Sequence, residues 1–92
     1  MAVPIKKQSK PISQLKKGDK LYIQGVEMIV DAHYLFIDHG NTKEMIIEVY
    51  NPKNNREYQI RYFDDQVESS IEIYELVGDF QYVKREAKYI EW

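Results

Sequence analysis

The fold is decided by residues 21–37, which read LYIQGVEMIVDAHYLFI. Aliphatic, β-branched and aromatic side chains dominate this stretch, and such residues favour β-strands. Gln24-Gly25 interrupts the run in the way typical of a two-residue hairpin, in which glycine takes a positive φ at little cost. We therefore predict a strand over residues 21–23, a tight turn, and a long second strand over residues 26–37.

Similar strands and turns follow along the rest of the chain. The pattern predicts strands over residues 44–50, 56–63 and 67–77 and a last one from residue 80, with turns at 51–55, at 64–66 and at Gly78-Asp79. A single 3₁₀ turn is expected within residues 12–19, and residues 84–92 fit either a strand or a short helix. Short strands joined by tight turns indicate an all-β fold, which we expect to be a small antiparallel SH3-like barrel of about five to six strands.

Alternation along the strands predicts which aromatic side chains are buried. Tyr34, Phe36, Tyr58 and Tyr62 share strand faces with aliphatic residues, so we expect them in the barrel core. The candidates for a protein interface are the tyrosines that alternate away from their aliphatic neighbours, namely Tyr22, Tyr50 and Tyr74. The last residue, Trp92, either anchors such an interface or closes the barrel, and the sequence pattern leaves both open.

Length and composition indicate one domain without covalent staples. A chain of 92 residues suffices for a single modest core. It has no cysteine, which excludes disulfides and thiolate zinc sites. The first residues contain no apolar run long enough for a signal peptide or a membrane span, so a cytoplasmic protein is expected.

Lysines are concentrated at the start of the chain. Residues 1–20 hold six lysines and one aspartate, a net charge of +5, whereas residues 21–92 carry −7. We predict that residues 1–11 form a flexible basic arm and residues 12–92 a single barrel domain. Lysines on a flexible segment gain affinity for RNA by releasing counterions from phosphates, and the candidate contacts are Lys6, Lys7, Lys10, Lys16 and Lys17. The alternative is a solvated leader, because the segment lacks arginine and interleaved aromatic residues.

Several short motifs occur in an order that is familiar from one protein family. They are Ser13-x-Leu15-Lys16-x-Gly18, Ile23-Gln24-Gly25, His39-Gly40 with Lys43 three residues on, and Asp65-x-Val67-Glu68. Over residues 12–76 the chain thereby resembles the N-terminal domain of the hypusine-containing translation factor of archaea and eukaryotes, whose bacterial counterpart is elongation factor P. The resemblance implies an SH3-like barrel and binding to the ribosome near the peptidyl-transferase centre.

One departure from that family falls in the loop over residues 38–43. The family carries its modified lysine just before His-Gly, but Asp38 stands at the matching position here. An aspartate cannot become hypusine and has the opposite charge, and we do not expect the family's second, oligonucleotide-binding-fold domain within these 92 residues. The loop is either a contact site, formed by Asp38, His39, Gly40, Asn41 and Lys43, or a plain hairpin connection.

Catalytic and metal-binding patterns are weak throughout. His33 and His39, with the neighbouring Asp31 and Asp38, are the only grouping of suitable residue types, and zinc sites need closer-defined spacings. Asp64-Asp65 fits a turn cap better than an acid–base pair, because adjacent side chains point apart. We expect no metal, no cofactor and no enzymatic activity.

These observations support two hypotheses about function. The first is a translation-factor-like binding module that contacts RNA or a ribonucleoprotein through the arm and the 38–43 loop. The second is a module for protein interaction or self-assembly that uses the acidic barrel surface and the exposed tyrosines. Its partner would be another protein or, in a homodimer, a second copy of the chain. The acidic body argues against nucleic acid covering the whole barrel.

Overall fold

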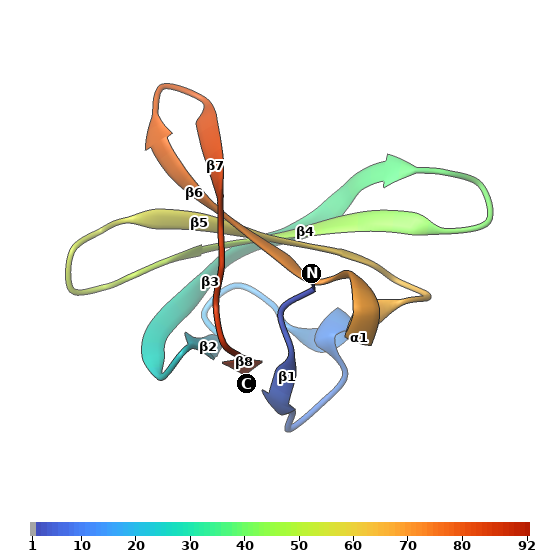
Figure 1. Cartoon of the computed structure of the whole chain (residues 1–92), viewed down its shortest axis with the longest axis horizontal. Coiled ribbons are helices and arrows are strands. Elements are labelled where there is room, and N and C mark those ends of the chain that lie inside the picture. The colour runs from blue at the N-terminus through green and yellow to red at the C-terminus, as the bar shows by residue number, and fades with distance from the viewer. Residues whose placement is uncertain (1) are drawn as a thin grey trace.

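A computed structural model describes residues 2–92 and contains a single curled sheet (Figure 1). Its strands are β1 (Ile5–Lys7), β2 (Lys20–Ile23), β3 (Val26–Asp38), β4 (Lys43–Tyr50), β5 (Glu57–Phe63), β6 (Glu72–Gly78), β7 (Gln81–Arg85) and β8 (Ile90–Glu91). Two short helical turns, η1 (Ile12–Gln14) and α1 (Val67–Ser70), complete the structure. The all-β, barrel-like class is confirmed, but the sheet has eight strands instead of five to six.

The additional strands come from the two ends of the chain. The order in the sheet is β1-β8-β2-β3-β4-β5-β6-β7, and β1 pairs with β8 in parallel while the other neighbours are antiparallel. Val3, ahead of β1, is only 3% exposed, and its N–H donates to the carbonyl of Ile71 at 2.8 Å. The prediction of a flexible arm is therefore wrong for the described residues 2–11, which are held by backbone bonds and one buried side chain.

Trp92 closes the barrel from the other end of the chain. Its side chain is 8% exposed and belongs to the core cluster. The indole Nε1–H donates to the carbonyl of Lys10 at 2.7 Å, and the backbone carbonyl of Trp92 accepts from Ser9 N–H at 2.8 Å. Of the two roles that the sequence allowed, the structure favours the one inside the barrel, because Trp92 packs in the core cluster. Residues 84–92, which by sequence fit either a strand or a short helix, contain the end of β7 and the strand β8 and no helix.

Strand β3 changes the face that its side chains present. The register with β4 shifts between Val30 and Ala32 and again between Leu35 and Ile37, so one extra residue of β3 is inserted at each place. Such bulges move the following side chains to the opposite face. Tyr34 and Phe36 are consequently 40% and 46% exposed on the outer face, and the prediction that they lie in the core is wrong.

The other predicted core tyrosines are inside. Tyr62 is buried in the core cluster, and Tyr58 is partly buried against it. The remaining buried members of the cluster come from nearly every strand and from the first turn: Val3, Ile12, Leu15, Leu21, Ile23, Met28, Val30, Ile47, Val49, Ile60, Ile71, Ile73, Ile90 and Trp92. One sheet face therefore carries the core.

Two boundaries near the end of the chain differ from the prediction. Residues 67–70 form the helical turn α1, and β6 begins only at Glu72. The hydroxyl of Ser70 accepts from Phe63 N–H at 2.9 Å, which satisfies the backbone where β5 ends and favours the turn. The next hairpin turns at Asp79-Phe80 instead of Gly78-Asp79, because Gly78 still pairs with Gln81, and Phe80 takes the positive φ of 61°. Strand β7 accordingly begins at Gln81, one residue later than expected.

Of the described residues, none lies in a helix that is long and apolar enough to span a membrane.

Candidate functional site

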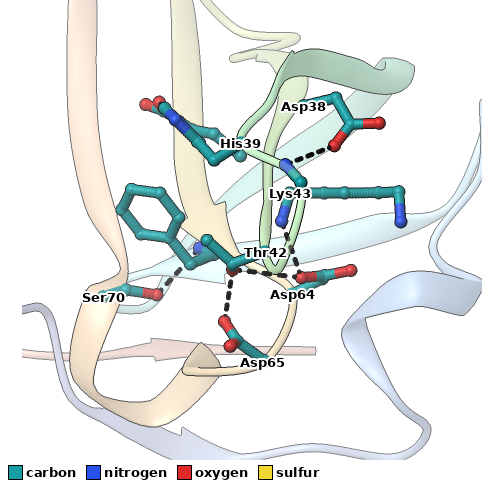
Figure 2. Close-up of polar contacts among 10 residues, drawn as sticks. Asp38, His39, Thr42, Lys43, Asp64, Asp65 and Ser70 are labelled. Carbon is teal, nitrogen blue, oxygen red and sulfur yellow. Dashed lines mark hydrogen bonds and ion pairs between the residues drawn. The ribbon is translucent and has the colours of Figure 1, made fainter.

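The loop over residues 38–43 connects β3 to β4 and is stabilised by its own polar groups (Figure 2). The carboxylate of Asp38 accepts from the N–H of Gly40 at 2.8 Å, and His39 N–H donates to the carbonyl of Thr42 at 2.9 Å. Gly40 has a φ of 87°, a value that glycine adopts without strain. Asp38 and Gly40 thus fulfil the geometric roles that a hairpin connection requires.

A second turn holds this loop from outside. Asp64 Oδ1 accepts from the N–H of Lys43 at 3.0 Å and from the hydroxyl of Thr42 at 3.4 Å, and Asp65 also accepts from that hydroxyl. Figure 2 shows both aspartates pointing at the base of the loop from the turn that follows β5. Asp64 caps a backbone N–H, but that N–H is Lys43 of the neighbouring loop and not part of the turn that the sequence predicted, and Asp65 bonds only to the Thr42 hydroxyl.

The charge around the loop is predominantly negative. Glu44 lies 3.5 Å from His39 Nε2, and Asp38, Asp64 and Asp65 are exposed close by. Lys43 is the one lysine of the loop, and Asn41 is an exposed residue at its tip. The predicted contact residues of the 38–43 loop do lie close together. The carboxylates around them repel phosphate groups, however, so this position disfavours RNA binding.

The other histidine, His33, is hydrogen-bonded through both ring nitrogens to distant parts of the fold. His33 Nδ1 lies 2.7 Å from the carbonyl of Leu15, and Nε2 lies 2.7 Å from the hydroxyl of Tyr62. Since a carbonyl can only accept, Nδ1 carries the proton, and in the neutral ring Nε2 accepts from the Tyr62 O–H. His33 therefore joins β3 to the first turn and to β5, and it is not near His39. Over residues 2–92, His, Cys, Asp and Glu side chains form no group that could hold a metal ion.

The predicted RNA-contacting lysines are divided between paired and exposed positions. Lys10 forms an ion pair with Asp19 at 2.8 Å, and the ammonium of Lys6 lies 4.6 Å from the ring centre of Tyr89. The Lys10 hydrogen bond is the main reason why the pKa of Asp19 is lowered. Three further lysines are exposed, namely Lys7, Lys16 and Lys17.

A different surface gathers most of the exposed aromatic residues. On the outer face of β3 to β7, opposite the core, cross-strand pairing places Tyr34 beside Ile46, Ile46 beside Arg61, and Tyr74 beside Gln59. We call this surface the tyrosine face; its aromatic members are Tyr34, Phe36, Tyr50, Tyr74 and Tyr82. Ile46 is 1% exposed but lies outside the core cluster, so these side chains cover it.

Arg61 organises the centre of the tyrosine face. Its guanidinium carbon lies 4.0 Å from the ring centre of Tyr74, 5.3 Å from that of Phe36 and 6.0 Å from that of Tyr82. Arg61 Nε and Nη2 both donate to Gln59 Oε1, at 3.2 and 3.0 Å. A cation that is stacked on several rings and hydrogen-bonded in its plane is held in one orientation.

Three hydroxyls of this face, those of Tyr34, Tyr74 and Tyr82, have a raised pKa and stay protonated at neutral pH. Burial, followed by the hydrogen bond to Glu48, raises the pKa of Tyr34 to about 12. Burial also raises the pKa of Tyr82, with additional contributions from the negative charges of Glu48 and Glu57. The same cause raises the pKa of Tyr74, which donates to Glu72 at 3.1 Å. The rings are therefore neutral, and the charges of the face come from its carboxylates and basic groups.

Comparison with known proteins gives no identification. No protein-family model matches the chain, and no significant match is found among curated proteins or solved structures.

The sequence-based candidates fall on different surfaces. Tyr50 and Tyr74 lie on the tyrosine face, but Tyr22 lies in β2 beside β8 and lines a separate groove with Lys7 and Trp92. Tyr34, Phe36 and Tyr82 were not among the predicted interface residues. The position of Tyr82 could have been predicted from the sequence, because Tyr82 alternates with Gln81 and Val83 in a short strand. The positions of Tyr34 and Phe36 could not, because they depend on the bulges in β3, which simple alternation does not reveal.

Proposed function

We propose that the protein is a non-enzymatic interaction module that binds a partner protein through the tyrosine face. The observation that carries this proposal is the set of aromatic rings that stand half-exposed on a sheet face outside the core. Tyrosine and arginine are enriched in the energetically dominant parts of protein interfaces. A cytoplasmic location, expected from the sequence, belongs to the same proposal.

The rigidity of this face supports the assignment. Its side chains stand on paired strands, and Arg61, Gln59 and Glu72 fix the orientation of the neighbouring rings by stacking and hydrogen bonds. Side chains that are ordered before binding lose less entropy on association. In the 38–43 loop, by contrast, the Asp38 carboxylate and the N–H of Lys43 are already used in bonds that hold the loop itself.

The double substitution Tyr34→Ser and Tyr82→Ser tests the proposal. We expect partners captured from the native organism to be recovered at least about 30-fold less, because removing hot-spot side chains costs about 2 kcal/mol or more. Affinity capture with quantitative mass spectrometry measures this, and circular dichroism verifies folding of each variant.

Tyr22→Ser is the matched control, since Tyr22 is a partly exposed strand tyrosine outside the tyrosine face. It is expected to recover the wild-type set of partners. If the double variant also recovers that set, the tyrosine face is not the binding surface.

The translation-factor-like RNA hypothesis stays a second proposal, favoured by one observation. Lys7, Lys16 and Lys17 are exposed, and no ion pair of the described residues includes them. Deletion of residues 1–11 is unsuitable as a test, because it removes the buried Val3 and the Lys10 carbonyl that accepts from Trp92.

The sharper test is the triple variant Lys7→Gln, Lys16→Gln and Lys17→Gln. If these lysines contact phosphates, the slope of log affinity against log salt for single-stranded RNA decreases by about 2, or about 0.7 for each lost contact. Fluorescence anisotropy over a range of salt concentrations measures the slope. An unchanged slope, or no binding by the wild-type protein at low salt, contradicts the RNA role.

A further inference from the structure

A small cleft opens beside Arg61 on the tyrosine face. It has a volume of about 100 Å³, and its lining includes Asp31, Glu48, Tyr50, Glu57, Gln59 and Tyr82. Asp31 reaches it because it sits at the first bulge of β3, between Val30 and Ala32. The volume suits the end of one long side chain and is too small for a folded segment.

The lining combines carboxylates with aromatic walls and contains no basic residue. Of the described ion pairs, none involves Asp31, Glu48 or Glu57. Glu48 accepts only from the Tyr34 hydroxyl, at 3.0 Å. The lining therefore carries three carboxylates that form no ion pair among the described residues, and a cation placed in the cleft gains from all three.

Arg61 provides independent evidence for what this surface accepts. Its guanidinium occupies the adjacent position on the same face, stacked on Tyr74 and bonded to Gln59. Gln59 is 6% exposed and also lines the cleft, and Tyr82 lies both near Arg61 and in the cleft wall. The chain thus already seats one of its own cations on aromatic rings, directly beside a cleft that shares Gln59 and Tyr82 with it and has no basic residue in its lining.

We propose that the cleft binds the cationic side chain of a lysine or arginine in a segment of the partner protein. Tyr50 and Tyr82 wall the bound cation through their ring faces, and Asp31, Glu48 and Glu57 neutralise it. This inference rests on the proposed function, because it names the chemistry of the partner at the tyrosine face. Nucleic acid does not fit the cleft, because its phosphates would meet three carboxylates and no basic residue in the lining.

Synthetic peptides test the proposal on the full chain. Three peptides of one glycine–serine framework carry several lysines, several arginines or several norleucines, and binding is followed by amide chemical shifts. We expect the lysine or the arginine peptide to shift the signals of Glu48, Tyr50, Glu57 and Tyr82, and the norleucine peptide to bind at least tenfold more weakly. Which of the two basic peptides binds more tightly identifies the cation. Equal binding of the norleucine peptide, or no binding of either basic peptide at low salt, overturns the proposal.

The double variant Glu48→Gln and Glu57→Gln distinguishes binding in the cleft from non-specific electrostatic attraction to the acidic protein. We expect its affinity for the basic peptide to fall about tenfold. Glu68→Gln with Glu86→Gln is the matched control, since it removes the same charge from exposed positions outside the cleft and should change affinity less than twofold. An equal loss in both variants means non-specific electrostatic attraction and overturns the proposal.

The two proposals fail in distinguishable ways. If the cellular partner is lost with Tyr34→Ser and Tyr82→Ser but retained with Glu48→Gln and Glu57→Gln, the tyrosine face binds protein but the cleft takes no cation. If both variants retain the partner, the proposed function itself fails. Light scattering of the wild-type protein covers self-association: a dimer that the tyrosine variant abolishes places a second copy on this face and overturns the inference.

Discussion

Trp92→Ala is expected to lower the free energy of unfolding by about 3–5 kcal/mol, the usual cost of truncating a large aromatic side chain in a core. The indole is 8% exposed and packs in the core cluster that also contains Val3 and Ile90. It also donates to the Lys10 carbonyl, so its loss releases both ends of the chain together. Urea unfolding followed by circular dichroism measures the change.

Phe80→Ala is the matched control, because Phe80 is an aromatic residue with 94% of its surface exposed. Substitution there should change the free energy of unfolding by no more than about 0.5 kcal/mol. Trp92→Phe is expected to lie between the two, since it keeps an aromatic ring but removes the indole N–H. If Trp92→Ala costs less than about 1 kcal/mol, Trp92 does not stabilise the barrel, and the interface role that the sequence also allows is favoured instead.

The second large effect is expected at Tyr62. Tyr62→Ala should lower the free energy of unfolding by about 3–5 kcal/mol, because the ring is 2% exposed among core side chains. Tyr62→Phe keeps the ring and removes only the hydroxyl bonded to His33 Nε2, so we expect a loss of about 1 kcal/mol. Chemical denaturation of both variants separates the packing contribution from the hydrogen bond.

Tyr62 should also make the free energy of unfolding depend on pH in the alkaline range. Burial raises the pKa of Tyr62 from 10.0 to about 12. The unfolded chain therefore loses this proton first, and the stability that Tyr62 contributes is complete below pH 10 and decreases as the pH rises toward 12. Tyr62→Phe should reduce the fall in stability over this window. An unchanged alkaline fall, together with no loss of stability for Tyr62→Phe, would contradict the buried His33–Tyr62 pair.

His33 illustrates how tertiary contacts assign a role to a residue type. The sequence groups it with acidic neighbours as the only candidate set of metal ligands. The structure gives both ring nitrogens a partner from distant parts of the chain, Leu15 and Tyr62. No spacing rule links these three positions, because the curl of the sheet brings them together.

The local features of the fold were predictable because they depend on neighbouring residues. Gln24 and Gly25 both have a positive φ, as the predicted hairpin requires, and Asn55 takes the left-handed conformation in the predicted 51–55 turn. The 3₁₀ turn was also expected, and the core side chains of β4 and β5 follow simple alternation. The sequence resemblance to translation factors remains a prediction.

Long-range features were decided only by the tertiary structure. Residues 5–7 lack strand character of their own and form β1 because Ile90 and Glu91 offer an edge to pair with. The bulges of β3 arise where the strand must bend around the barrel, and a shift of one residue reverses every side chain that follows. Residues 21–37 thus determine by themselves a hairpin and a long strand. The curled sheet decides that Tyr34 and Phe36 leave the core and that Asp31 enters the cleft, because a bulge depends on the curvature of the whole sheet.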